Sequence, residues 1–288
     1  MAIACKRPAS GLTGRAPFCL VFGGDVRWDD AFHRLRREHP FSSIRIGKSG
    51  LVSNLVSPVT VSAYLSPSEI DALYLSLKVA LVATLWTLPP GIAIAFVLAR
   101  FKFPGHAILN GLVHLPLVMP PVVTGYLLLI AFGRNGVIGH ALDACCGIVF
   151  AFRWTGAALA AAVMAFPLVV RAIRLSIEAV DKRLEDSARN LGAPPLTVFL
   201  RITLPLSAPG LIAGAVIGFA KALGEFGATI TFVSSIPGET QTIPSAIYAL
   251  IQTPAGDGPA FKLVLVSIAI SFIGLLVSEA LARRVARP

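Results

Sequence analysis

The chain has 288 residues, of which 55% are hydrophobic and only 14% are charged, whereas soluble domains average roughly 45–50% and 25%. This excess of apolar residues argues against a soluble protein and favours one that lies in a bilayer. The formal net charge of +10 does not indicate a nucleic-acid-binding protein, because the basic residues form no stripe interleaved with aromatic residues.

Residues 1–66 differ in composition from the rest of the chain. They are basic and rich in Ser, Gly and Pro, and nine of the 25 Lys and Arg residues precede residue 50. Gly47-Lys48-Ser49 ends like a phosphate-binding loop, but Ser42 stands where that motif needs Gly, so we interpret the match as coincidence. We expect a basic N-terminal extension that is disordered or that precedes the natural start of the protein.

Five apolar segments follow, each near the roughly 20 residues that cross a ~30 Å hydrocarbon core. Helices are expected there because backbone amides in lipid must be paired within their own segment. The predicted helices cover about residues 73–98, 107–132, 155–173, 209–232 and 261–282. The sequence therefore predicts an all-α membrane protein whose transmembrane domain covers residues 67–288.

The basic residues of the connections predict the orientation, because loops rich in Lys and Arg stay in the cytoplasm. The connection between the third and fourth predicted helices is the most basic, whereas residues 233–260 contain no Lys or Arg. We therefore expect the N-terminus outside and the C-terminus in the cytoplasm. The basic N-terminal segment conflicts with this orientation, and we hypothesise that translation begins near residues 51–66.

The basic connection between the third and fourth helices carries start and stop signals for two short helices. Asp181 can cap the first of them, and the first turns of that helix are acidic. Gly192 can end it in the left-handed conformation. Pro194 and Pro195 can then open a second short helix over Leu196 to Arg201. We expect two short helices, joined by a bend, on the cytoplasmic side.

This connection resembles the EAA loop of ABC-importer permeases, in which E-A-A is followed by three residues, Gly, nine residues and I-x-L-P. The spacing is intact, and Asp and Ser replace the first Glu and Ala conservatively. The matching region contains Glu185, Asp186, Ser187, Ala188, Gly192, Ile202, Leu204 and Pro205. The resemblance implies a type I, MetI-like permease with five transmembrane helices, whose loop fits a groove on a separate ATPase subunit. The alternative is a basic amphipathic loop that lies on the lipid surface.

Other segments look like those of molybdate permease subunits of the ModB type. They are Leu75 to Val79, His114 to Val123, Gly133 to Gly139, Gly224 to Phe232, Ile236 to Pro244 and Ile251 to Pro254. The resemblance covers roughly residues 67–285. It implies a homodimer in the bacterial plasma membrane that works with ABC ATPase subunits and an extracytoplasmic molybdate-binding protein. ATP and Mg²⁺ would then bind the ATPase subunits, and this chain would carry no cofactor, no metal and no catalytic residue.

Two charged residues fall within the fourth predicted helix. Lys221 and Glu225 lie one turn apart on one face, and charges at such depth face a water-filled cavity or each other. We consider two roles: a pair that lines the translocation path, with Lys221 attracting a dianion, and a structural ion pair between helices.

Glycines and prolines mark further candidate positions. Gly210, Gly214 and Gly218 repeat every four residues, a spacing typical of close helix packing within a bundle or across a dimer axis. Pro120 and Pro121, with Pro116 before them, disrupt the second predicted helix. Such breaks are tolerated where they line a cavity or are buried in protein, so these prolines are either path candidates or a packing kink.

Together these features favour the permease subunit of an ATP-driven molybdate importer that works by alternating access. A permease for tungstate, sulfate or thiosulfate is the nearest alternative. A membrane scaffold or receptor that uses the same loop to bind a soluble partner, without transport, is the alternative from another class.

The proposed late start of translation predicts a shortened protein. Intact-mass measurement of the natively expressed chain should give a mass that lacks about the first 50–65 residues. A full-length mass would refute the late start.

Overall fold

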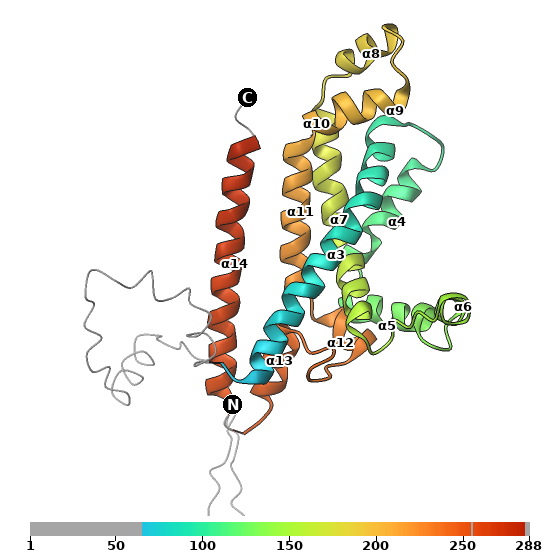
Figure 1. Cartoon of the computed structure of the whole chain (residues 1–288). Helices are drawn as coiled ribbons and strands as arrows, with labels where there is room; N and C mark the ends of the chain where they lie inside the picture. Colours follow the sequence, from blue (N-terminus) through green and yellow to red (C-terminus); the bar gives the residue numbers. More distant parts are fainter. Residues whose placement is uncertain (1–64, 255, 286–288) are drawn as a thin grey trace, which may run out of the picture. The chain divides into compact units, whose positions relative to one another are not determined.

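The computed structural model describes residues 65–254 and 256–285, and all the regular structure there is helical (Figure 1). This confirms the all-α prediction. Three helices are long and apolar enough to cross a membrane, and two bent pairs of helices qualify if each pair counts as one span. The predicted N-terminal extension lies almost wholly outside the described residues.

Helix α3, Pro67–Arg100, begins at a capping box in which Ser66 and Glu69 exchange side-chain and backbone hydrogen bonds. Residues 79–99 carry no Asp, Glu, Lys or Arg, and about 20 residues suffice to cross the hydrocarbon core. Lys78 and Arg100 therefore mark the two boundaries of the apolar part of α3. The helix extends beyond the predicted range of 73–98 at both ends.

The second predicted helix, over 107–132, is broken into two helices, as its prolines indicated. Helix α4, His106–Val118, is followed by α5, Pro121–Phe132, at an angle of 111°. A residue that precedes a proline is driven to extended backbone, and Met119 and Pro120 both precede one, with ψ of 146° and 133°. Pro116, in contrast, lies inside α4 without ending it.

After α5 the chain forms α6, Val137–Cys146, and then α7, Trp154–Ala179. Helix α7 is the central helix of the bundle, because α3, α4, α5, α11 and α12 all contact it. The last helices are α13, Ile243–Ile251, and α14, Asp257–Val285, which contact each other.

The fourth predicted helix, over 209–232, is wrong as a continuous helix. Helix α11, Ala208–Leu223, ends at Gly224, and α12, Gly227–Val233, follows after a short break. Phe226, with φ of −127° and ψ of −52°, does not continue the helix. Lys221 and Glu225 are the only charged residues of this stretch, so hydropathy alone does not mark this break.

Glycines of α11 pack directly against α7. A Cβ atom on Gly210 would lie 2.1 Å from Cβ of Ser176, and one on Gly218 would lie 2.7 Å from Cγ2 of Val169. Gly214 faces Ile173 in the same way, at 3.2 Å. These three glycines therefore bring α11 and α7 together within one subunit.

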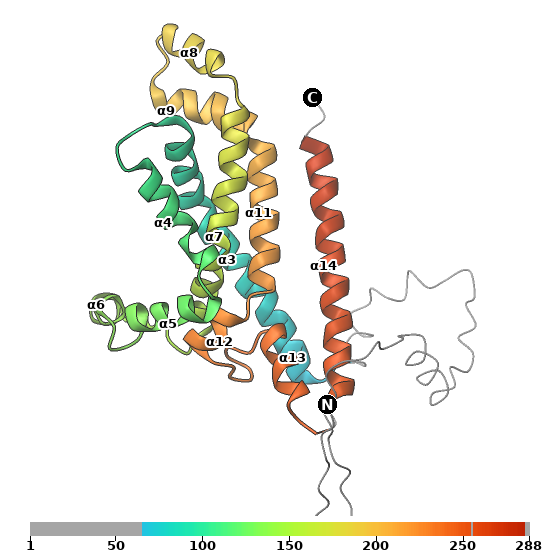
Figure 2. The ribbon, with the colours of Figure 1, turned by 180° about the vertical axis from the view of Figure 1, so that it is seen from behind.

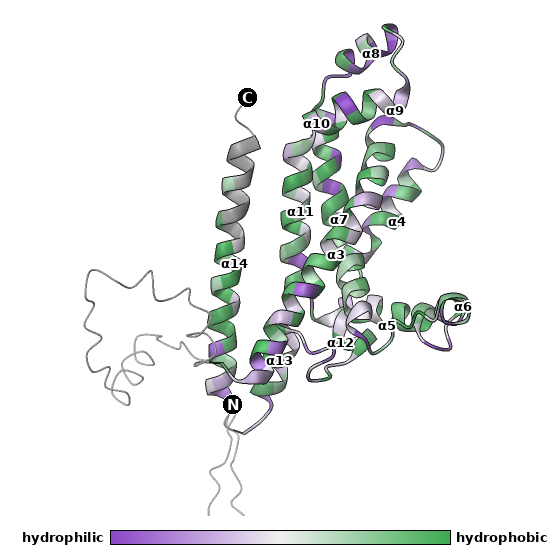
Figure 3. Ribbon diagram, viewed as in Figure 1, coloured by the Kyte–Doolittle hydropathy of each residue, from purple (hydrophilic) through white to green (hydrophobic). Residues whose placement is uncertain are grey.

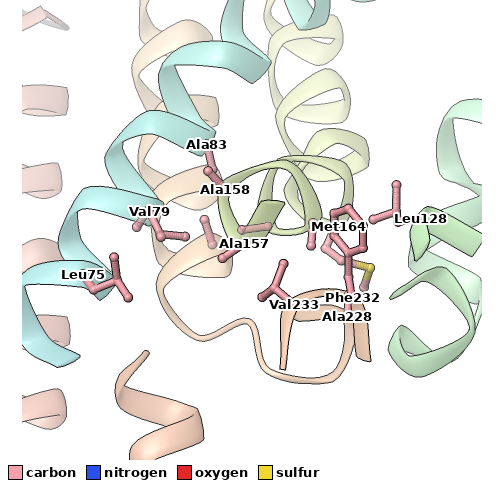
Figure 4. Close-up of a cluster of buried hydrophobic side chains, with 14 of the residues drawn as sticks. Leu75, Val79, Ala83, Leu128, Ala157, Ala158, Met164, Ala228, Phe232 and Val233 are labelled. Atoms are coloured by element: carbon pink, nitrogen blue, oxygen red, sulfur yellow. The ribbon is translucent and has the colours of Figure 1, made fainter. Parts of the chain in front are cut away.

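The core contains mainly small and branched apolar side chains. One buried cluster joins α3, α5, α7 and α12, and Figure 4 shows Val79 and Ala83 of α3 beside Ala157 and Ala158 of α7, with Phe232 of α12 nearby. The ribbon coloured by hydropathy is green along α7 and α11 and purple at α8 (Figure 3). The view from behind shows α8 at the opposite end of the bundle from α12 and α13 (Figure 2).

The close contact of α11 with α7 predicts that Gly210→Ala destabilises the protein. Overpacking of this kind costs about 1–3 kcal/mol, so thermal unfolding in detergent should begin several degrees lower. Gly111→Ala is the matched control, because a Cβ atom there meets no atom within 4 Å and alanine favours a helix. Equal unfolding temperatures for the two variants would contradict this packing.

Candidate functional site

Residues 181–206, which we call the coupling loop, form two helical segments that project from one end of the bundle (Figures 1 and 2). The first is α8, Lys182–Asn190. The second, Pro195–Leu206, consists of α9, Pro195–Val198, the π-helix η1, Phe199–Thr203, and α10, Leu204–Leu206.

Local signals in the sequence produce this loop. The side chain of Asp181 caps α8 by accepting a hydrogen bond from the backbone N–H of Arg183, at 2.9 Å. Gly192 adopts the left-handed conformation, with φ of +85°, and ends the turn after α8. Pro194 and Pro195 open the second segment, which extends beyond the predicted Leu196 to Arg201.

Glu185 points into the protein and is only 2% exposed. Its Oε1 accepts hydrogen bonds from Nε and Nη2 of Arg100, at 3.1 and 2.7 Å, and from the hydroxyl of Thr203, at 2.8 Å. Arg100 also donates to the backbone oxygen of Val180, at 3.1 Å. These bonds join the end of α3, the start of α8 and the π-helix η1 at a single carboxylate.

The Arg100–Glu185 ion pair is buried on both sides, with side-chain exposures of 7% and 3%. Nη1 of Arg100 has no hydrogen-bond partner within the described residues. Removing one member of such a pair leaves an uncompensated buried charge, which typically costs about 3–5 kcal/mol. The pair therefore fixes where the coupling loop stands on the bundle.

The outer surface of the coupling loop is polar with exposed leucines. Leu191 beside the bend is 88% exposed, and Leu196 is 68% exposed. Asp186 and Ser187 are also exposed, and Ala188 is half-buried. The exposed leucines beside the bend are therefore candidates for contact with a partner.

The end of the coupling loop leads directly into α11. The segments Pro195–Leu206 and Ala208–Leu223 meet at 69°. Ile202 and Leu204 are half-buried and Pro205 is exposed, while Ser207 at the corner is fully buried and bonds with its hydroxyl to the backbone oxygen of Leu204. The coupling loop therefore continues into α11 without an intervening linker.

Lys221 and Glu225 lie at the far end of α11, at the break, and not in the middle of a continuous helix as predicted. The Lys221 Nζ atom lies 2.6 Å from Oε2 of Glu225. The Glu225 side chain is 1% exposed, whereas Lys221 is 29% exposed. Oε1 of Glu225 accepts a hydrogen bond from the backbone N–H of Ala228, at 3.0 Å, so this carboxylate connects the two helices across the break.

The two broken helices meet each other. A Cβ atom on Gly227, at the start of α12, would lie 2.7 Å from Cβ of Pro121, at the start of α5. A Cβ atom on Gly125 would lie 2.5 Å from the backbone oxygen of Ala228. The Pro120–Pro121 break and the Gly224–Phe226 break, far apart in the sequence, are therefore adjacent in the fold.

Apart from the three glycines along α11, the predicted site residues form two groups at opposite ends of that helix. The coupling loop lies at one end, and the two adjacent breaks lie at the other. A helix of this length spans about 24 Å at 1.5 Å per residue. Among the described residues no group of His, Cys, Asp and Glu side chains is placed to bind a metal ion.

A family model described as "Binding-protein-dependent transport system inner membrane component" matches residues 91–287. The chain belongs to this family. It is accordingly a multi-pass inner-membrane transport subunit of a binding-protein-dependent system, and not itself an enzyme.

Named relatives within this permease family are close. The chain is 60% identical over 219 residues to the molybdenum transport system permease protein ModB of Escherichia coli strain K12. This match covers 76% of this chain and 96% of that protein. It is 57% identical to the Haemophilus influenzae protein of the same name, over 75% and 94%. The sulfate transport system permease protein CysT of Salmonella typhimurium is 32% identical, over 76% and 80%.

Solved permeases share the fold of this chain. The MetNI methionine ABC transporter in an inward-facing conformation matches with a TM-score of 0.62 at 15% identity, covering 80% of this chain and 100% of that one. A bacterial ABC transporter for alginate matches with a TM-score of 0.66 at 18% identity, covering 91% of each chain. These likenesses support the MetI-like fold predicted from the sequence.

Arg100 and Thr203 were not predicted from the sequence as parts of the permease site. The only signal at Arg100 was that it is the first charge after the uncharged residues 79–99, a position that many cytoplasmic boundary residues share. Thr203 lies between Ile202 and Leu204 of the family motif and carries no pattern of its own. Their roles depend on contacts with Glu185, which is 85 residues from Arg100.

The buried ion pair predicts strong coupling between its two members. Glu185→Leu should destabilise the purified protein by about 3–5 kcal/mol, because it leaves the buried charge of Arg100 unpaired. Arg100→Met should cost less, because Glu185 keeps its ion pair with the more exposed Arg189, at 3.5 Å. The double variant should recover most of the loss caused by Glu185→Leu in thermal unfolding. Arg174→Met, which breaks a more exposed pair with Glu178, is the control and should cost about 1 kcal/mol or less. Additive losses in the double variant would contradict the pairing.

Proposed function

We propose that this chain is the transmembrane permease subunit of an ATP-driven molybdate importer. The observation that carries the proposal is the coupling loop, whose two helices and bend are fixed to the bundle through Glu185 and continue directly into α11. The similarity to molybdenum permeases of two bacteria, at 57–60% identity, supports molybdate over sulfate, for which the similarity is 32%.

The distribution of basic residues supports a cytoplasmic coupling loop. The loop and the end of α7 before it contain more Lys and Arg residues than any other connection between the helices. Residues 233–260, at the other end of the bundle, contain no Lys or Arg. The positive-inside rule then places α8 in the cytoplasm and α6, α12 and α13 on the outer side. The described part of the chain thus starts outside and ends inside.

The partners follow from this orientation. Two copies of the chain form a homodimer, and an ABC ATPase subunit receives the exposed leucines and acidic residues of each coupling loop. ATP and Mg²⁺ act on those ATPase subunits. The outer connections, which contain Glu239, Gln241 and Tyr248, receive the extracytoplasmic molybdate-binding protein.

Transport then proceeds by alternating access. Closure of the ATPase pair on ATP brings the two coupling loops together, and each loop moves its α11 because Ser207 is the only residue between them. The displacement reaches the adjacent breaks at Pro121 and Gly227, where the helices are already interrupted. The outward-open state takes the oxyanion, and hydrolysis resets the bundle. Differential contacts in the two states must carry this coupling.

Vesicle uptake distinguishes the alternatives. Vesicles that contain this chain, its ATPase and the binding protein should accumulate labelled molybdate only with ATP, and excess sulfate should compete poorly. Efficient competition by sulfate would favour the sulfate permease. Binding of the ATPase subunit without any uptake would favour the scaffold.

The Lys221–Glu225 pair predicts a specific transport defect if Lys221 lies on the path. Lys221→Met should abolish molybdate uptake while the complex still assembles, because the positive charge beside the break is lost. Uptake in reconstituted vesicles, with co-purification of the ATPase, measures both properties. Lys262→Met, which removes an exposed lysine on α14, is the control and should keep uptake.

A double variant separates the path from a structural role of this pair. Lys221→Met with Glu225→Gln removes both charges and keeps an oxygen that can accept from the N–H of Ala228. Uptake that stays lost supports the path role, whereas recovered uptake would assign the pair to structure alone.

A further inference from the structure

Two adjoining pockets lie beside α3, at the end of the bundle opposite the coupling loop: the larger lies between α3 and the connections near the start of α7, and the smaller lies between α3 and α7. The larger, the basic pocket of about 770 Å³, is lined by Lys78, Arg134 and Arg153 among others. The smaller, the apolar groove of about 180 Å³, is lined almost wholly by apolar side chains. Trp154 lines both pockets, so the basic pocket and the apolar groove are adjacent at this side chain.

The apolar groove follows the helix axes. Lys78, Val82 and Trp86 succeed one another at intervals of four residues on one face of α3, and Trp154, Ala158 and Ala162 do the same on α7. Both helices start at the same end of the bundle, so the groove runs inward from Lys78 for about 12 Å. The small side chains of Ala83 and Ala158, seen together in Figure 4, leave room for it.

The position of the groove matches the edge of the hydrocarbon core. Lys78 is the last charge before the uncharged residues 79–99 of α3, and Arg153 directly precedes the uncharged start of α7. Tryptophan is typical of this level of the bilayer. Trp86, deeper in the groove, is 75% exposed. The basic pocket therefore lies at the headgroup level and the apolar groove at the level of the acyl chains.

The cations of the basic pocket are not neutralised by ion pairs. Lys78 lies over the ring of Trp154, 3.8 Å from its centroid. Neither Lys78, Arg134 nor Arg153 forms a salt bridge within residues 65–254 and 256–285. Asp71 and Glu239 also line the pocket, so the lining keeps a net positive charge.

We propose that this composite site binds one anionic phospholipid, with its phosphate at Lys78 and Arg153 and an acyl chain in the apolar groove. A basic pocket between transmembrane helices is suited to an anionic headgroup, and charge complementarity favours this occupant over a neutral lipid. The apolar groove favours a lipid over a free oxyanion, because an oxyanion has no apolar part that could occupy the groove. The lipid belongs to the outer leaflet, an assignment that rests on the orientation given under Proposed function.

Brominated lipids test the site, because bromine quenches a tryptophan that it contacts. The full-length chain with Trp28→Phe keeps only Trp86 and Trp154, and both line the apolar groove. Reconstituted in phosphatidylcholine, it is titrated with chain-brominated phosphatidylglycerol or chain-brominated phosphatidylcholine. The relative association constant should favour phosphatidylglycerol by about fivefold or more.

Matched variants assign the preference to the basic pocket. The double variant Lys78→Met with Arg153→Gln should abolish the preference, so that the two lipids have association constants in a ratio of about one. Lys78→Arg and the control Lys262→Met should keep the preference. Equal quenching by the two lipids, or a preference that survives the double variant, would overturn the proposal. No quenching by either lipid would also overturn it and would indicate that a second copy of the chain covers the groove. Displacement of the lipid by molybdate or phosphate, but not by chloride of equal ionic strength, would overturn it in favour of a free-oxyanion site.

Discussion

The arrangement of this permease depends on the buried ion pair between Arg100 and Glu185. Helix α3 ends at Arg100, and the carboxylate of Glu185 holds that end, the start of α8 and the hydroxyl of Thr203 together. This carboxylate acts together with the contact between the rings of Phe96 and Phe199, whose centroids are 4.6 Å apart, in attaching the coupling loop to the bundle. With both, force applied to the exposed surface at Leu191 and Leu196 acts on the bundle through a rigid junction.

Helix α11 connects that junction to the part of the bundle whose helices are interrupted. The glycines of α11 bring this helix into close contact with α7. At the far end of α11, Glu225 bonds both Lys221 and the backbone of α12, and α12 packs against the start of α5. The coupling loop, α11 and the two helix breaks are thus connected in one series.

The parts of the fold that were predicted from sequence are those encoded locally. Asp181, Gly192 and Pro195 act on the neighbouring backbone, so the two helices and the bend of the coupling loop were predictable from them alone. The inward direction of Glu185 was not, because Arg100 lies 85 residues away. Likewise, Pro120 and Pro121 predicted a disruption but not a turn of 111°, and the break at Gly224–Phe226 lies in an apolar stretch whose hydropathy resembles one span.

Cysteine accessibility tests the central claim, that an intracellular motor grips the bend at Gly192. In a chain with Cys5 and Cys19 replaced by Ser, Leu191→Cys supplies a thiol beside the bend, and the exposed native Cys145 and Cys146 lie at the opposite end. A membrane-impermeant maleimide added to intact cells should label Cys145 and Cys146 but not position 191, which should be labelled only after lysis and be protected by the ATPase subunit. Labelling of position 191 in intact cells would contradict the account.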